Sequence, residues 1–124
     1  MTPRSKRGVT FDRVTEIGLA LPGVAVSPSY GTPSLKVKGA LFARLKEDGE
    51  TLVLKVDRVS RDLMLSAQPD LFFLTDHYRD YPYILVRLPR ATDAEMRELI
   101  EDAWALAAPR KLVAERKSQP RRAK

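Results

Sequence analysis

The chain has 124 residues, a formal net charge of +6 and no cysteine. This length fits one domain with a single hydrophobic core and leaves no room for a second one. Without cysteine, disulfides and thiolate metal sites are excluded, and the composition is compatible with a reducing compartment. No apolar stretch approaches the roughly 20 residues that a membrane-spanning helix requires. No signal-peptide arrangement is present either, so a cytoplasmic protein is expected.

The positive charge is concentrated at the two ends of the chain. Residues 110–124 hold seven basic side chains against one acidic, and residues 1–7 hold three basic side chains and no acidic one. Basic ends add sequence-independent affinity for phosphate backbones, and they are also common as solubilising segments. We therefore expect a disordered basic N-terminal arm over residues 1–9, one domain over 10–109 and a basic C-terminal tail over 110–124.

Thr10 can cap a first helix. Apolar residues recur there at helical spacing, namely Phe11, Val14, Ile17 and Leu21. Pro22 and Gly23 then end the helix. The next residues, 24–33, show no period and contain two prolines and a glycine around Tyr30. They predict a loop of about ten residues, longer than the usual connection of about 4 to 6, and a loop of that length is a candidate functional segment.

Between Leu35 and Val56 the hydrophobic period changes to two, which is typical of strands. Asp48-Gly49 predicts a two-residue hairpin turn of type I′. The pairs that this turn places on the core side are Leu45 with Leu52, Ala43 with Leu54, and Leu41 with Val56. The pairs on the outer side are Lys46 with Thr51, Arg44 with Val53, and Phe42 with Lys55. A three-residue turn around Gly39 would add Leu35 and Val37 to the core, and Lys36 and Lys38 to the outer face.

Two helices and a strand complete the predicted domain. Asp57 can cap a helix over 58–68 that would bury Val59, Leu63 and Ala67. Pro82 precedes a strand over 83–88 that turns one face to the core (Ile84, Val86 and Leu88) and the other outward (Tyr83, Leu85 and Arg87).

The last helix begins at the capping box Thr92 to Glu95, ends at Pro109, and carries one apolar stripe: Met96, Leu99, Ile100, Ala103 and Leu106 or Ala107. Trp104 lies beside that stripe and is expected in the core. The order of elements predicts a single-domain α+β fold. Its antiparallel sheet would hold a three-stranded meander plus at least one further strand, packed by helices on one face.

The outer face of the predicted sheet is the first candidate site. Basic side chains alternate there with aromatic ones: Lys36, Lys38, Phe42, Arg44, Lys46, Lys55, Tyr83 and Arg87. Phosphate contact combined with base stacking requires such a surface. An ordinary solvated sheet face also carries lysine and arginine, so the pattern alone leaves both interpretations open.

The second candidate site is a pair of polar, aromatic loops. Its residues are Tyr30, Asp76, His77, Tyr78, Arg79 and Tyr81. An imidazole beside carboxylates and phenols can act as a general acid or base. It can also have a structural role, in which His and Tyr hydrogen bonds stabilise a turn under the sheet. His77 is the only histidine and there is no cysteine, so no metal site or other cofactor is expected. No serine lies in a nucleophile motif, and no catalytic residue is assigned.

Five short motifs occur in order along the chain. They are LALPGV (19–24), SYGTP (29–33), GALFARL (39–45), FLTDHY (73–78) with YPYILVRL (81–88), and AW (103–104) with AP (108–109). Together they resemble the MmcQ/YjbR-like family of bacteria over residues 19–109. Two positions depart from the family's usual pattern: Tyr83 stands where tryptophan is more frequent, and Asp76 where proline is.

The resemblance implies a compact α+β fold of the kind described as a double-wing DNA-binding arrangement. Family members are usually labelled DNA-binding proteins, a label drawn largely from fold similarity, which does not establish function. The leading expectation is a non-catalytic DNA-binding protein that uses the basic sheet face and the basic tails. The alternative is a protein- or small-ligand-interaction module that uses the aromatic loops around Tyr30 and His77.

Overall fold

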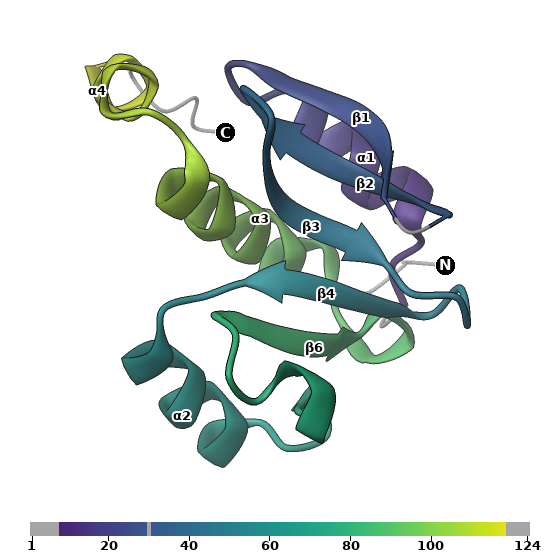
Figure 1. Ribbon diagram of the computed structural model, residues 1–124. Helices are drawn as coiled ribbons and strands as arrows, with labels where there is room; N and C mark the ends of the chain where they lie inside the picture. Colours follow the sequence, from purple (N-terminus) through teal and green to yellow (C-terminus); the bar gives the residue numbers. More distant parts are fainter. Residues whose placement is uncertain (1–7, 30, 119–124) are drawn as a thin grey trace, which may run out of the picture.

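In the computed structural model, which describes residues 8–29 and 31–118, six strands form one antiparallel sheet (Figure 1). The strands are β1 (Val24–Ser29), β2 (Thr32–Val37), β3 (Ala40–Leu45), β4 (Thr51–Lys55), β5 (Phe72–Phe73) and β6 (Tyr83–Arg87). They lie in the order β1-β2-β3-β4-β6-β5. The helices are α1 (Phe11–Leu19), α2 (Arg58–Ala67), α3 (Asp93–Ala107) and α4 (Arg110–Ser118), with 3-10 turns η1 (Asp76–Tyr78) and η2 (Leu88–Arg90). The expected α+β class and antiparallel sheet are confirmed.

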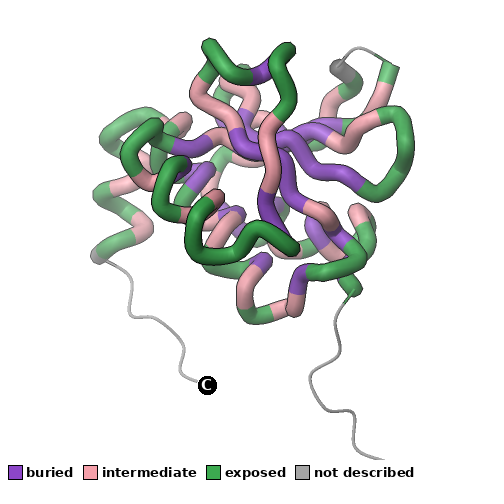
Figure 2. The backbone as a smooth tube through the Cα atoms, turned by 90° about the horizontal axis from the view of Figure 1, so that it is seen from below, coloured by how far each residue is buried: buried purple, intermediate pink, exposed green. Residues whose placement is uncertain are grey.

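The main core lies between the sheet and the helices α1 and α3. In Figure 1 both helices lie behind the sheet, with α3 packed across β3 and β4. Thr10 caps α1, and Thr92 with Glu95 forms the capping box of α3, as the sequence predicts. Trp104 is 1% exposed, and its Nε1 donates to the Pro22 carbonyl at 2.9 Å. This bond holds α3 against the turn that follows α1. Figure 2 shows that the middle of the sheet is buried, whereas turns and outward helix faces are exposed.

The segment predicted as a loop over 24–33 is instead a hairpin. Strand β1 pairs with β2 from Val24 opposite Val37 to Ser29 opposite Thr32. Prolines 28 and 33 suggested a loop, but they face each other in this hairpin, and β1 is an edge strand. The pairing of β2 with β3 begins only at Ser34. The missing N–H groups of the prolines therefore cost the sheet little. Tyr30 lies outside the described residues.

Strand β3 contains a bulge that the sequence pattern did not reveal. Lys38 and Gly39 have φ values of 51° and 85°, as a two-residue type I′ turn requires. The register then runs from Val37 opposite Ala40 and Lys36 opposite Leu41 to Leu35 opposite Ala43. The extra residue is Phe42, which enters the core and is 0% exposed. The predicted outward position of Phe42, and the core position of Leu41, are therefore wrong.

The register of the β3–β4 hairpin is confirmed from Ala43 to Leu45, whereas the predicted pairs of Leu41 with Val56 and Phe42 with Lys55 are not formed, and the turn differs from the prediction. Leu45 lies opposite Leu52, and Ala43 opposite Leu54. Gly49 has positive φ, whereas the preceding Asp48 does not, which excludes type I′. The Asp48 carboxylate instead accepts from the backbone N–H groups of Glu50 and Thr51, at 2.8 and 2.9 Å.

The face of helix α2 that packs against the rest of the protein is not the predicted one. Val59 and Leu63 are 74% and 66% exposed, whereas Arg61 is 7% exposed. Met64 and Leu65 supply the apolar contacts with the main core. The helix is rotated because the Arg61 guanidinium donates to backbone carbonyls beyond η1, and these contacts fix its orientation. The cap at Asp57 is confirmed, since its carboxylate accepts from the Ser60 N–H at 2.8 Å.

Both predicted terminal segments contain ordered structure next to the domain. Val9 is buried, and its N–H donates to the Leu88 carbonyl at 3.0 Å. Residues 1–7 and 119–124 lie outside the described residues. Helix α4 occupies the first part of the predicted C-terminal tail, with Leu112 and Val113 packed against the core. Arg116 pairs with Glu101 of α3 at 3.0 Å.

Candidate nucleic-acid interface

The described residues of the two candidate sites lie on the same outer face of the sheet. Val53 and Leu85, both predicted to point outward, are 2% and 0% exposed. Tyr78 of η1 covers them and forms a second small apolar cluster with them. Phe73, Leu74 and Tyr83 pack around that cluster. The segment 74–83 is therefore a cap over part of the face that was expected to be solvated, and we call it the η1 cap.

Arg44 joins the sheet to the η1 cap. It is 6% exposed, and its guanidinium donates to the Tyr78 hydroxyl at 2.8 Å. The same guanidinium donates to Thr32 Oγ1 at 3.0 Å and lies 3.7 Å from the Glu47 carboxylate. The positive charge of Arg44 is thus enclosed under Tyr78. The prediction that Arg44 presents an outward charge for a phosphate is not supported by this geometry.

Arg61 holds the η1 cap from its other side. Its guanidinium donates to the carbonyls of Tyr81 at 2.7 Å, Arg79 at 3.1 Å and Tyr83 at 3.2 Å, with a longer contact of 3.5 Å to Tyr78. Its Nε is buried without a hydrogen-bond partner in the described part of the chain. Hydrogen bonds to a charged donor are stronger than neutral ones, so these contacts fix the path of the cap. Sequence patterns gave no signal for this role, because the acceptors are backbone groups.

Three lysines remain on the outer face around the cap. The Nζ of Lys46 lies 5.8 Å from the centre of the Tyr78 ring, and the Nζ of Lys55 lies 5.8 Å from the centre of the Tyr83 ring. Both distances fit cation–π contact. Lys36 is half-buried and lies opposite Leu41. Within residues 8–29 and 31–118, none of these three lysines forms an ion pair. We call them the face lysines.

The other two predicted cations of this face have different surroundings. The Arg87 guanidinium lies 4.2 Å from the centre of the Phe73 ring and donates to the Pro69 carbonyl at 3.2 Å. Lys38 is exposed at the tip of the β2–β3 turn. Asp76 and Asp80 of the η1 cap and Asp48 of the β3–β4 turn are acidic groups near this face, and the carboxylate closest to Arg44 is that of Glu47. Its pKa lies below the ordinary value, first because of a backbone hydrogen bond and then because of the charges of Arg44 and Lys46. Glu47 is therefore ionised at neutral pH and faces an already enclosed arginine.

The predicted loop site is divided between buried and exposed groups. Tyr78 is enclosed, whereas His77 and Tyr81 are exposed with ring centres 6.3 Å apart. Arg79 pairs with Asp76 at 2.9 Å, also at the surface. Among the described residues, no group of three or more His, Asp or Glu side chains is placed to hold a metal ion.

The model of the YjbR family matches residues 19–106 of this chain. Two curated relatives, Uncharacterized protein Rv2570 of Mycobacterium tuberculosis and Uncharacterized protein Mb2600 of Mycobacterium bovis, are each 38% identical over 50 residues. That stretch is 40% of this chain and 39% of each relative, so the match spans about two fifths of their length.

A solved structure is similar over a longer part of the chain. It is the crystal structure of Deinococcus radiodurans protein DR2400, a DUF419 domain, with a TM-score of 0.67 and 22% sequence identity. The likeness covers 78% of this chain and 77% of that one, and it supports the fold described above. No helix within the described ranges has the length and apolar character needed to cross a bilayer.

Proposed function

We propose that this chain, which belongs to the YjbR family, is a non-catalytic cytoplasmic DNA-binding protein that contacts phosphates through the outer face of its sheet. The observation that carries the proposal is the set of face lysines, Lys36, Lys46 and Lys55. They project from β2, from the residue after β3 and from β4, which are neighbouring strands. Lys46 lies beside Thr51 at the start of β4, whereas Lys36 and Lys55 lie toward the other end of these strands. Because they form no ion pair in the described part of the chain, their charge is available to an anionic partner.

The aromatic ring of Tyr83, which is half-buried under Lys55, favours a nucleic acid over a simple anion. A lysine contacts the backbone while an adjacent ring offers a surface for base stacking. The face is also held rigid by Arg44 and Arg61, so little conformational entropy is lost when its lysines meet phosphates.

Fluorescence anisotropy with labelled duplex and single-stranded DNA across a salt series tests this proposal. The variant with all three face lysines changed to Gln should lose about 2.7 from the magnitude of the duplex salt slope, at about 0.9 per phosphate contact. The matched control changes Arg110, Lys111 and Lys117 of α4 to Gln, which removes the same charge from another surface. Equal slopes for the parent and the face variant would refute the proposal. An equal loss in both variants would show general electrostatic attraction only.

The exposed pair His77 and Tyr81 supports a second candidate, the protein- or small-ligand-interaction module. Two adjacent exposed rings form a recognition surface that needs no phosphate. The double variant His77→Ala and Tyr81→Ala distinguishes the two functions, because it leaves the face lysines in place. DNA binding that survives this change and is lost with the face lysines favours the first function. A thermal-shift ligand screen against parent and double variant measures the second.

A further inference from the structure

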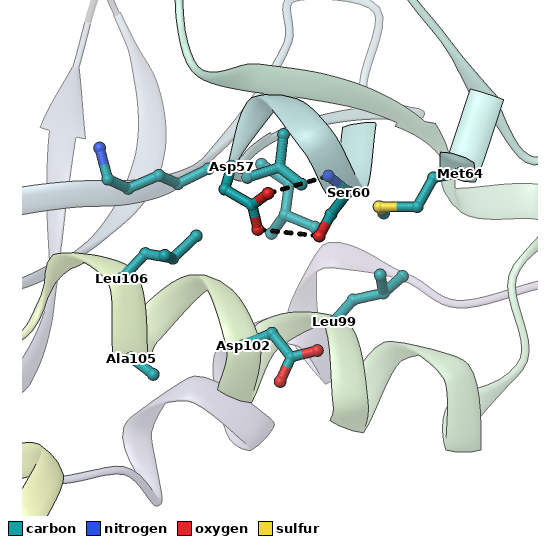
Figure 3. A pocket seen from close by; sticks show the side chains of 10 residues that line it. Asp57, Ser60, Met64, Leu99, Asp102, Ala105 and Leu106 are labelled. Atoms are coloured by element: carbon teal, nitrogen blue, oxygen red, sulfur yellow. Dashed lines mark hydrogen bonds between the residues drawn. The ribbon is translucent and has the colours of Figure 1, made fainter. Parts of the chain in front are cut away.

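A groove opens between α2 and α3, on the helical side of the molecule (Figure 3). Its volume is about 380 Å³, which lies within the range of small-molecule sites, about 300 to 1,000 Å³. Its lining is mainly apolar, with Met64 from α2 and Leu99 and Leu106 from α3 among the contributors. Leu106 is 46% exposed there. An apolar groove of this size that is open to water is suited to a small ligand.

The charge that faces into the groove is negative. Figure 3 shows Asp57 and Ser60 on the α2 wall and Asp102 on the α3 wall. Lys55 also lines the groove, but its amino group is directed to the Tyr83 ring. The Asp57 carboxylate is held by the N–H and the hydroxyl of Ser60, both at 2.8 Å, and its pKa is lowered by these bonds. Asp57 therefore stays ionised.

Asp102 is the carboxylate of this groove that lacks a partner. Within the described residues it forms no hydrogen bond and no ion pair. Burial, followed by the charges of Glu98 and Glu101 on the same helix, raises its pKa above the ordinary value. Of these two neighbours, Glu101 is already paired with Arg116. A cation placed in the groove would meet this exposed, unpaired carboxylate beside Leu99 and Leu106. Arg97, Arg116 and Lys117 line a neighbouring hollow that also includes Asp102.

We propose that this groove binds a small amphiphilic organic cation, with its ammonium group at Asp102 and its alkyl chain against Met64, Leu99 and Leu106. The apolar walls take the chain by the hydrophobic effect, and the ammonium donates to the carboxylate in a charge-assisted hydrogen bond. Of the face lysines, Lys55 lines this groove, whereas Lys36 and Lys46 do not. The test of this groove is independent of DNA binding, so either proposal can fail alone.

The test uses the full chain, ¹⁵N-labelled, titrated with hexylamine and with hexanol and hexanoate as probes of the same length. Hexylamine should bind most tightly and hexanoate least, with amide shifts at Met64, Leu99, Asp102 and Leu106. Asp102→Asn should weaken hexylamine binding about tenfold and leave hexanol binding unchanged. Hexylamine should also lower the pKa of Asp102 in a carboxyl NMR titration.

The matched control is Glu98→Gln, which removes a carboxylate one turn earlier on α3 that does not line this groove. Glu98→Gln should retain hexylamine binding within about twofold, since its charge acts only at a distance. Melting temperatures of both variants verify that they are folded. Equal affinities for hexylamine and hexanol, or an equal loss in both variants, would overturn the proposal. Binding of a Leu/Lys peptide without binding of hexylamine would also overturn it, and would assign the groove to a protein partner.

Discussion

The buried arginine on α2 offers the sharpest test of how the η1 cap is held. We expect Arg61→Met to lower the free energy of unfolding by about 2 to 4 kcal/mol. Each hydrogen bond from a charged donor is worth about 1.5 to 3 kcal/mol, and part of this loss is offset because the variant no longer has to desolvate a buried charge. The offset is incomplete because the guanidinium makes contacts of 2.7, 3.1 and 3.2 Å to three carbonyls. Methionine keeps an unbranched stem and a good helix propensity, so the change isolates the guanidinium.

Urea unfolding followed by Trp104 fluorescence measures this effect, since Trp104 is in the main core. With a slope of about 2 kcal/mol per molar urea, the midpoint should fall by about 1 to 2 M. Chymotrypsin should also cleave faster after Tyr78, because the cap that encloses this residue loses its anchor. The control is Arg58→Met on the same helix, whose exposed guanidinium donates to one carbonyl, that of Asp80. A loss below about 0.5 kcal/mol for Arg61→Met would refute the anchoring role, since ordinary surface changes lie within that range.

Two further predictions concern the core and the response to acid. Phe42→Ala should lower the free energy of unfolding, measured with denaturant, by about 3 to 5 kcal/mol, because Phe42 is in the core. Leu41→Ala should lower it much less, because Leu41 points outward, and the reverse order would contradict the bulge at Phe42. Arg13, followed by Arg97, lowers the pKa of Asp93 from 3.8 to about 2. A lowered carboxyl pKa stabilises the fold above the unfolded-state value and loses that effect as pH falls from about 4 to about 2. Because the Asp93 side chain is 46% exposed, Asp93→Asn should be less stable than the parent by at most about 1 kcal/mol at neutral pH. This difference in stability between parent and variant should disappear near pH 2.

Local rules in the sequence predicted much of the fold. The caps at Thr10, Asp57 and Thr92 are correct, because a capping side chain and the N–H that it accepts from lie within three residues of each other. The β3–β4 register is correct because the hydrophobic alternation and the turn position agree. The 24–33 hairpin was missed because prolines at an edge leave no periodic signal.

The rest depended on contacts between distant parts of the chain. Arg61 lies 20 residues along the chain from Tyr81, the acceptor of its shortest hydrogen bond, and Arg44 lies 34 residues from Tyr78. No pattern within one element reports such a contact, so the rotation of α2 and the enclosure of Arg44 were not predictable. Both candidate sites could be proposed from their residue types. That they lie together on one face, with Tyr78 over the sheet, depends on contacts between distant residues and could not be predicted.

The bulge at Phe42 has a consequence for how this sheet tolerates changes in chain length. Phe42 is the residue that the ladder skips, because Lys36 pairs with Leu41 and Leu35 pairs with Ala43. Deleting Phe42 alone would therefore leave Leu35 and Val37 on the core side and remove only a buried side chain, whereas deleting a paired residue of β3 would reverse the faces of the residues beyond it. A change of chain length at position 42 is thus expected to alter the core packing and to leave the two faces of the sheet unchanged.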